Sequence, residues 1–158
     1  MPEGHTIHKI ARDHGKLLDG KVIRVSSPQG PFAADAARVD GAVLERTDCH
    51  GKHLFYHWST GEVGHVHLGL FGKFKVHTGD DRPEPRGAVR MRLVADSATI
   101  DLAGPTACSI DDPSVRTEIL GRLGPDPIKP RQSKQKMFDK ISRSKRGIGD
   151  LLMDQSVV

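Results

Sequence analysis

Apolar residues near the amino end of the chain recur at helical spacing. Within residues 3–17 they fall at Ile7, Ile10, Ala11 and Leu17, which places them on one face of a helix with 3.6 residues per turn. The remaining positions of this stretch are mostly polar or charged. The pattern therefore predicts an amphipathic helix that begins almost at the start of the chain.

From Lys21 onward the hydrophobic period shortens to two. Alternating or β-branched runs are separated by turns that contain glycine, which is the pattern of strands joined by tight connections. A short helix is expected over 33–39, and the last two strands are expected to pair as a hairpin around Asp96 and Ser97. The predicted strands cover seven ranges: 21–27, 42–49, 52–59, 62–68, 72–77, 89–95 and 98–103. The sequence thus predicts a mainly β, α+β protein with mostly antiparallel strands.

The last third of the chain changes character. Residues 113–122 form a predicted short helix, with Asp112 as its N-cap and Pro113 in its first turn, because proline is favoured at a helix start. Residues 123–130 carry three prolines and are predicted to form a linker.

Two further helices are predicted, at 134–142 and 147–154, but they offer too few apolar positions for a core of their own. We therefore expect one domain over 1–122, the linker at 123–130, and in 131–158 the first helices of a second, helical domain that continues beyond Val158.

Composition narrows the class of protein. With 158 residues, of which 36% are hydrophobic and 28% charged, the chain is expected to fold rather than remain disordered. Its apolar runs are far shorter than the roughly 20 residues of a membrane span or the core of a signal peptide, so a cytoplasmic location without membrane contact is expected. Cys49 and Cys108 can form at most one bridge and cannot make a four-cysteine zinc site.

Positive charge is concentrated late in the chain. Residues 129–146 hold eight Lys or Arg against one acid, so this block carries +7 while the net charge of the chain is +4. Such a block indicates either a solvated helix face or a partner with regularly spaced phosphates. Aromatic residues make up only 4% of the chain, too few for stacking along single strands, so a duplex is the expected form if the partner is a nucleic acid. The candidate contacts are Lys129, Arg131, Lys134, Lys145 and Arg146.

Candidate chemistry lies at the first residues. Pro2 follows Met1, and removal of the methionine would leave a secondary amine, which can attack a sugar aldehyde carbon to form an iminium. An α-amino group titrates near 8, well below a lysine, and the start of a helix lowers that value further. Glu3 is placed to move protons beside the amine. The alternative is that Pro2 and Glu3 simply begin a helix.

Five separated motifs resemble the formamidopyrimidine-DNA glycosylase and endonuclease VIII family. In order and spacing they cover nearly the whole chain: MPEGHTIHKIA (1–11), HGKHLFYH (50–57), HVHLGLFGKF (65–74), LGPDPI (123–128) and SKRGIGDLLMDQSVV (144–158). The resemblance implies that Pro2 is the nucleophile at the anomeric carbon of a damaged nucleotide and that Glu3 is the proton donor and acceptor.

The same resemblance assigns three more residues. Lys52, in the GKHL turn, matches an essential lysine that holds the phosphate and the opened sugar. Leu70, in HLGLFG, matches the apolar side chain that fills the gap left by the flipped-out nucleotide. Lys73 follows the loop and is expected to contact a neighbouring phosphate.

The family architecture is an antiparallel two-sheet β-sandwich with a long amino-terminal helix, followed by a domain with a helix-two-turn-helix and usually a zinc or zincless finger. A finger would lie beyond residue 158, and no cofactor is expected in this chain. The resemblance implies a monomeric DNA glycosylase and abasic-site lyase that acts on damaged double-stranded DNA. The PEG start and the sequence after the predicted strand 98–103, which lacks an arginine, favour the endonuclease VIII branch and oxidised pyrimidines. Thr6 stands where the family usually has a second glutamate.

Two alternatives stay open. His65 and His67 would share one face of a strand, and zinc would need further ligands such as His53, His57 and Cys49; strand histidines on a half-buried sheet are commoner. The stronger alternative is a non-catalytic or truncated DNA-binding module of the same fold. If Met1 stays on the chain, the Pro2 nitrogen is an amide and cannot be a nucleophile.

Overall fold

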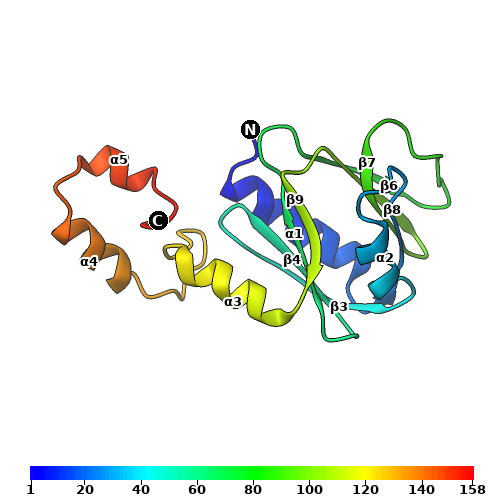
Figure 1. Ribbon diagram of the computed structural model, residues 1–158, viewed down its shortest axis with the longest axis horizontal. Helices are drawn as coiled ribbons and strands as arrows, with labels where there is room; N and C mark the ends of the chain where they lie inside the picture. The colour runs from blue at the N-terminus through cyan, green and yellow to red at the C-terminus, as the bar shows by residue number, and fades with distance from the viewer. The chain divides into compact units, whose positions relative to one another are not determined.

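The computed structural model describes all 158 residues. The chain forms two compact units, Met1–Pro113 and Ser114–Val158, most of whose elements are labelled in Figure 1. The division between these units falls at the start of the helix Pro113–Arg122, whereas the sequence analysis placed that helix at the end of the first domain. Each unit is described below by itself.

The first unit contains two helices and nine strands. The helices are α1 (Gly4–Leu18) and α2 (Ala33–Val39), close to the predicted ranges. The strands are β1 (Lys21–Val22), β2 (Arg24–Ser26), β3 (Val43–His50), β4 (His53–Trp58), β5 (Val63–His67), β6 (Lys73–Thr78), β7 (Val89–Val94), β8 (Ala98–Ala103) and β9 (Ala107–Asp111).

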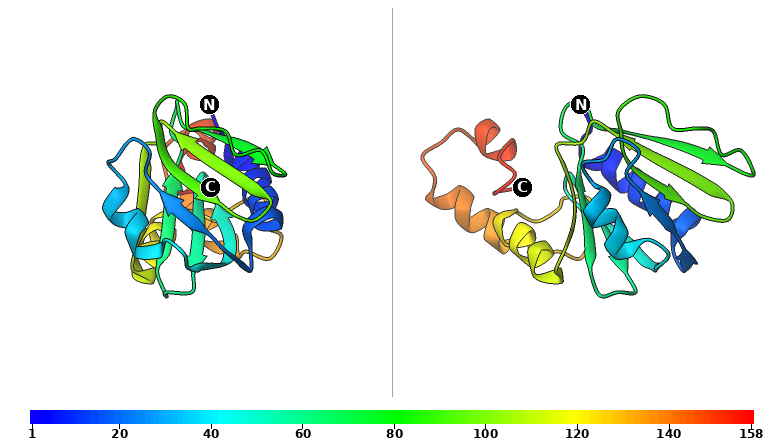
Figure 2. Two further views of the ribbon diagram at one scale, coloured as in Figure 1. Left: turned by 90° about the vertical axis from the view of Figure 1, so that its right-hand side faces the viewer. Right: turned by 45° about the vertical axis from the view of Figure 1, so that its right-hand side comes forward.

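These strands form two antiparallel sheets. One has the order β1-β3-β4-β5-β9 and the other the order β2-β7-β8-β6. Side chains from both sheets, such as Tyr56 on β4 and Ile100 on β8, meet in one buried core, and Figure 2 shows the two layers from two directions. The predicted antiparallel α+β fold with two sheets is confirmed.

The structure has two more strands than the sequence predicted. The range 21–27 is split at Ile23, which is buried and bonds through its N–H to Ala42, so that β1 joins one sheet and β2 the other. Strand β9 was missed because Gly104 and Pro105 mark this region as a loop. It forms because β5 offers its free edge as a pairing partner.

Helix α1 packs its apolar face into this core. Ile7, Ala11 and Leu18 are buried, as the helical period predicted. His14 is buried on the same face and shares a hydrogen bond of 2.7 Å with the hydroxyl of Tyr56 on β4. The helix is therefore fixed to the strand that follows the turn at Lys52.

The second unit contains α3 (Pro113–Arg122), α4 (Gln135–Arg143) and α5 (Ile148–Leu152). Its helices match the predicted ones, and α4 has no buried residue, in line with the shortage of apolar positions. Backbone N–H groups of the predicted linker, residues 123–130, form hydrogen bonds with other residues of the second unit. Asp126 is buried, and its backbone N–H donates to Gln132, while the N–H of Gly124 donates to the carbonyl of Gln155.

None of the helices combines the length and the apolar character that crossing a membrane requires.

Candidate active site

The first functional side chain lies at the start of α1. Glu3 has extended backbone angles (φ −105°, ψ 171°), and its carbonyl accepts the N–H groups of Thr6 and Ile7 at 3.0 and 3.1 Å. Its carboxylate makes no capping hydrogen bond to the helix, although glutamate at a helix start is often drawn to the free N–H groups there. The carboxylate is thus available for another partner.

That partner is Lys52. Its Nζ lies 3.3 Å from Oε2 of Glu3. Lys52 belongs to the two-residue turn between β3 and β4, closed by the pair His50 and His53. Gly51 has φ +55°, a left-handed value that favours glycine in such turns. The structure therefore brings together two residues that the resemblance assigned to one site.

The site is open to solvent. The side chains of Glu3 and Lys52 are 46% and 26% exposed, and Pro2, which precedes Glu3 in the sequence, is half-buried. Met1 is exposed, so it lies within reach of a processing enzyme. Pro2 directly precedes the residue whose carboxylate contacts the Lys52 ammonium group. A carboxylate and an ammonium group are the combination that proton transfer and anion binding require.

Three histidines lie next to this turn. The Nδ1 of His53 lies 2.9 Å from Nε2 of His65, and the rings of His53 and His67 are 4.8 Å apart between centroids. Burial lowers the pKa of His67, and the Lys52 charge lowers it further. Burial also lowers the pKa of His65. Neutral imidazoles are therefore favoured beside the ammonium group.

The sequence analysis did not place these histidines next to Lys52, although His53 follows it directly and His65 and His67 alternate on a predicted strand. The chain contains no group of three or more His, Cys, Asp or Glu side chains arranged to hold a metal ion.

Leu70, the side chain predicted to fill the gap in the duplex, lies in a tight loop between β5 and β6. This loop, residues 68–72, is called the wedge loop, and its exposed apolar side chains are called the wedge. The N–H of Gly72 donates to the carbonyl of Leu68 at 2.9 Å, and a Cβ on Gly72 would lie 2.2 Å from that oxygen. This closure presents Leu70 and Phe71 outward, with 64% and 83% exposure. The sequence analysis assigned only Leu70 to this role and missed Phe71. The signal that could have identified Phe71 is that two adjacent apolar residues lie between two glycines in a predicted loop.

Lys73 begins β6 directly after this loop and is exposed. Its contact with a DNA phosphate stays a prediction. Glu3, Lys52, Leu70 and Lys73 all belong to the first unit.

The basic block lies in the second unit. Arg131, Lys134 and Lys145 are exposed and Lys129 is half-buried. Arg146 differs from the others, because its guanidinium donates to Asp154 at 2.9 Å and to the carbonyl of Asp150 at 3.3 Å.

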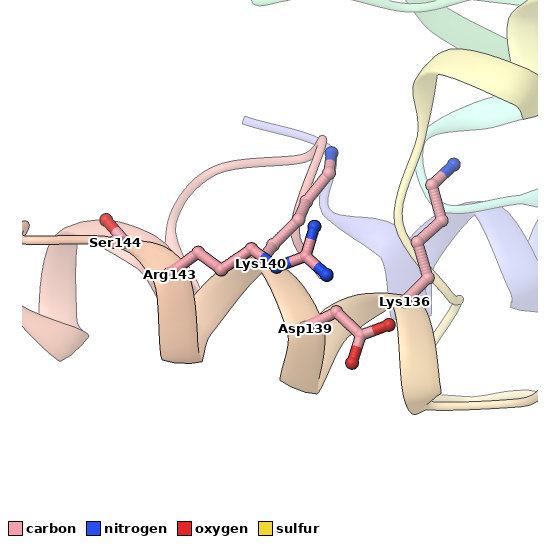
Figure 3. Close-up of a pocket in the computed structure, with 5 residues that line it drawn as sticks. All are labelled: Lys136, Asp139, Lys140, Arg143 and Ser144. Carbon is pink, nitrogen blue, oxygen red and sulfur yellow. The ribbon is translucent and has the colours of Figure 1, made fainter.

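Helix α4 adds basic residues that the sequence analysis did not assign to DNA. A hollow of about 490 Å³ is lined by Lys136, Asp139, Lys140, Arg143 and Ser144 (Figure 3). The ammonium groups of Lys136 and Lys140 are held by the backbone carbonyls of Gly121 and Ser156.

Comparison with known proteins gives one family. Residues 1–112 match the model of the formamidopyrimidine-DNA glycosylase N-terminal domain, a range that ends beside the boundary between the two units. The chain is 48% identical over 162 residues to endonuclease 8 1 of Mycobacterium tuberculosis, covering 100% of this chain and 60% of that protein. It is 29% identical to the probable endonuclease 8 2 of Streptomyces coelicolor, covering 98% and 57%.

Solved structures share the fold. The MutM (Fpg) protein of Thermus thermophilus matches with a TM-score of 0.75 at 24% identity, covering 99% of this chain and 59% of that one. The Lactococcus lactis formamidopyrimidine-DNA glycosylase, non-covalently bound to DNA containing an AP site, matches with a TM-score of 0.79 at 15% identity, covering 99% and 63%.

The chain thus spans about 60% of the length of the curated relatives it matches. The match to the family model extends over the whole first unit up to residue 112, including the Glu3–Lys52 pair and the wedge loop. The chain belongs to the formamidopyrimidine-DNA glycosylase and endonuclease VIII family.

Proposed function

We propose that this chain is the catalytic part of a base-excision repair enzyme, a DNA glycosylase with abasic-site lyase activity that uses Pro2 as its nucleophile. The observation that carries the proposal is the 3.3 Å contact between Glu3 and Lys52. It joins the start of α1, directly after Pro2 in the sequence, to the β3–β4 turn.

Each group has a defined task in this reaction. After Met1 is removed, the lone pair of the Pro2 nitrogen attacks the anomeric carbon of the damaged nucleotide, and the glycosidic bond breaks as the base leaves with a proton. Glu3 protonates the ring oxygen as the sugar opens, which leaves an iminium between Pro2 and the sugar. Lys52 binds the adjacent phosphate through its compact ammonium group.

Strand cleavage follows from the same intermediate. The iminium withdraws electrons from the neighbouring sugar carbon, so a base can remove a proton there and the phosphate on the 3′ side leaves. A second elimination releases the phosphate on the 5′ side, and water then frees Pro2. The iminium itself accepts the electron pair, so we propose that this chemistry needs no cofactor.

The wedge loop explains how the nucleotide reaches the amine. Chemistry at a nucleotide inside a duplex requires that it be flipped out of the stack, which costs a few kcal/mol. Leu70 and Phe71 are exposed apolar side chains that could fill the resulting gap, as inserted wedges do in other DNA-binding proteins. We propose damaged duplex DNA as the substrate, with oxidised pyrimidines preferred, and a DNA contact at Lys73.

The test is borohydride trapping on a duplex with a single abasic site, using chain whose amino terminus has been verified by mass spectrometry. Reduction of the iminium should give a covalent protein–DNA adduct that maps to Pro2. Glu3→Gln should abolish strand cleavage and retain duplex binding.

The matched control is the same chain with Met1 retained, which keeps the fold and turns the Pro2 nitrogen into an amide. An adduct of equal yield from that control would overturn the role of Pro2. Binding without any adduct from the processed chain would instead support the non-catalytic DNA-binding module.

A further inference from the structure

A second feature of the first unit lies beside the wedge. A groove of about 390 Å³ runs between β6 and the loop 79–88, over the outer face of the four-stranded sheet. Its lining includes the cations Lys73, Lys75 and Arg86, the acids Asp81 and Glu84, and His77. The groove is outside the Glu3–Lys52 pair, and only Lys73 has been given a role so far.

The walls of the groove are anchored by two arginines. Arg92 on β7 holds Asp101 on β8 through two hydrogen bonds of 2.7 and 2.8 Å, and it also donates to the carbonyl of Pro83 at 2.7 Å. Arg82 donates to the carbonyls of Ala95 and Asp96, both at 3.1 Å. The loop is thus tied to the sheet at two points, and its shape is defined before any ligand binds.

The floor of the groove is electrically neutral. The side chains of Arg92 and Asp101 are only 12% and 8% exposed, and the hydrogen bond to Asp101 is the main cause that raises the pKa of Arg92, with a smaller contribution from Glu84. Asp101 is therefore already compensated. The charge that a ligand meets comes from the walls.

The register of the sheet sorts those wall charges along the groove. Lys73 on β6 pairs with Ala103 on β8, which also pairs with Val89 on β7. This row lies nearest the wedge, because Lys73 directly follows Gly72. Arg86 precedes Val89 by three residues. Lys75 pairs with Asp101, whose charge is neutralised by Arg92. At the far end of the groove, His77 pairs with Thr99. His77 is four residues before the loop residue Asp81. The row next to the wedge therefore carries the cation Lys73, while the acid Glu84 lies close enough to Arg92 to raise its pKa.

The wedge and the groove are in contact through the backbone. A Cβ on Gly104, directly after β8, would lie 3.3 Å from the carbonyl of Phe71. Lys73 follows the wedge loop without a break, and Lys75 points to the same side of the strand two residues later, about 6.6–6.8 Å further along. The exposed apolar residues of the wedge loop are thus followed along β6 by two cations, Lys73 and Lys75.

We propose that Lys73, Lys75 and Arg86 bind the phosphodiester backbone of the DNA that flanks the wedge. The inference rests on the proposed function, because it takes duplex DNA as the partner. Lysine and arginine side chains that neutralise phosphates release bound counterions, which makes binding tighter and dependent on salt. The groove holds the flanking DNA while Leu70 and Phe71 occupy the gap.

The experiment measures binding of the full 158-residue chain to an undamaged duplex by fluorescence anisotropy at several salt concentrations. The variant Lys75→Gln/Arg86→Gln should reduce the slope of log affinity against log salt by about 1.8, because each lost phosphate contact removes about 0.9. If the affinities converge at 1 M salt, this equals a loss of about 60-fold at 0.1 M. Both side chains are exposed, so thermal unfolding should not change.

The matched control is Arg12→Gln/Lys16→Gln, which removes the same charge from exposed positions on α1. A slope change equal to that of the control would overturn the proposal, because it would show a general effect of net charge. A duplex shortened on the side that enters the groove should lower the slope of the unsubstituted chain and leave that of the groove variant unchanged. Equal responses to the shorter duplex would also overturn it.

Borohydride trapping separates this inference from the proposed function. It is done with the unsubstituted, processed chain at saturating protein, so that the adduct reports on the chemistry and the salt slope reports on the groove. Salt-dependent binding through the groove without any adduct from the processed chain would support the groove and contradict the catalytic proposal. Absence of salt-dependent DNA binding by the unsubstituted chain would overturn both.

Discussion

The Nζ of Lys52 lies 3.3 Å from Oε2 of Glu3, and this contact joins the start of α1 to the turn between β3 and β4. Exposed ion pairs of this kind contribute only about 0–1 kcal/mol to stability, and both side chains are accessible. The pair therefore contributes little to the folded state. In the proposed reaction the contact brings Glu3, the proton-transfer group, next to Lys52, the anion-binding group.

Substitutions at the pair should separate chemistry from stability. Glu3→Gln is expected to lower the single-turnover rate of base removal by about 10²–10⁴-fold, the usual contribution of a positioned acid or base, with unchanged duplex affinity. Lys52→Ala should lower both rate and affinity, because the phosphate loses its ammonium partner. Thermal unfolding of both variants should match the unsubstituted chain, and a large fall in melting temperature would show that the pair is structural instead.

Substitutions in the wedge should reduce activity on duplex DNA without changing the stability of the fold. Leu70 and Phe71 are exposed, so Leu70→Ala and Phe71→Ala should leave the free energy of unfolding within about 0.5 kcal/mol of the unsubstituted chain. Burying such a side chain in the gap of a flipped nucleotide is worth about 1.5–3 kcal/mol, so each variant should lose roughly 10- to 150-fold in base removal. Activity on single-stranded DNA is the control, since no stack has to be opened there.

Local pattern was sufficient to predict most of the elements. The helical period of Ile7 and Ala11 predicted α1, and the alternation of Leu54, Tyr56 and Trp58 predicted β4, because in each case one face is buried in the core. The split between β1 and β2 was not predictable from periodicity. Ile23 continues the alternation of apolar and polar residues at the point where the chain passes from one sheet to the other. The position of this crossing is set by the strands with which β1 and β2 pair.

The candidate site was less predictable than the fold. Glu3 and Lys52 came from motifs, and their contact follows from packing of α1 against β3 and β4, a long-range property that no local pattern encodes. Strand β9 was missed because it forms by pairing with the edge of β5, which the local sequence does not encode. The groove over β6 was missed for the same reason, since Lys73 and Arg86 come together only through the register of three strands.

Two neighbouring basic residues of the second unit should differ in their effect on DNA binding. Arg146 is engaged by Asp154, and this guanidinium is the main cause that lowers the pKa of the Asp154 carboxyl to about 2. Lys145 is exposed. If the basic block binds phosphates, Lys145→Gln should reduce the salt slope by about 0.9, whereas Arg146→Gln should change it less, because its guanidinium is already engaged by Asp154. Equal slope changes would contradict the structural role of Arg146.

The buried pair His14 and Tyr56 should make the fold sensitive to acid. Burial lowers the pKa of His14 to about 4, against about 6.5 in an unfolded chain. Below pH 6.5 the unfolded chain therefore takes up a proton that the folded chain refuses until about pH 4. The free energy of unfolding should fall across this window by roughly 3 kcal/mol, because one pKa unit corresponds to about 1.4 kcal/mol.

A variant without the titrating group isolates this contribution. His14→Gln keeps a polar side chain toward the Tyr56 hydroxyl and removes the imidazole, so it should be less stable at pH 7 by about 1–3 kcal/mol but should lose less stability between pH 6.5 and pH 4. Urea unfolding at both pH values measures the difference. Since His14 fixes α1 to the strand that follows Lys52, the adduct yield of the unsubstituted chain should fall at low pH together with its stability. Parallel pH profiles for the two proteins would mean that other groups control the acid transition.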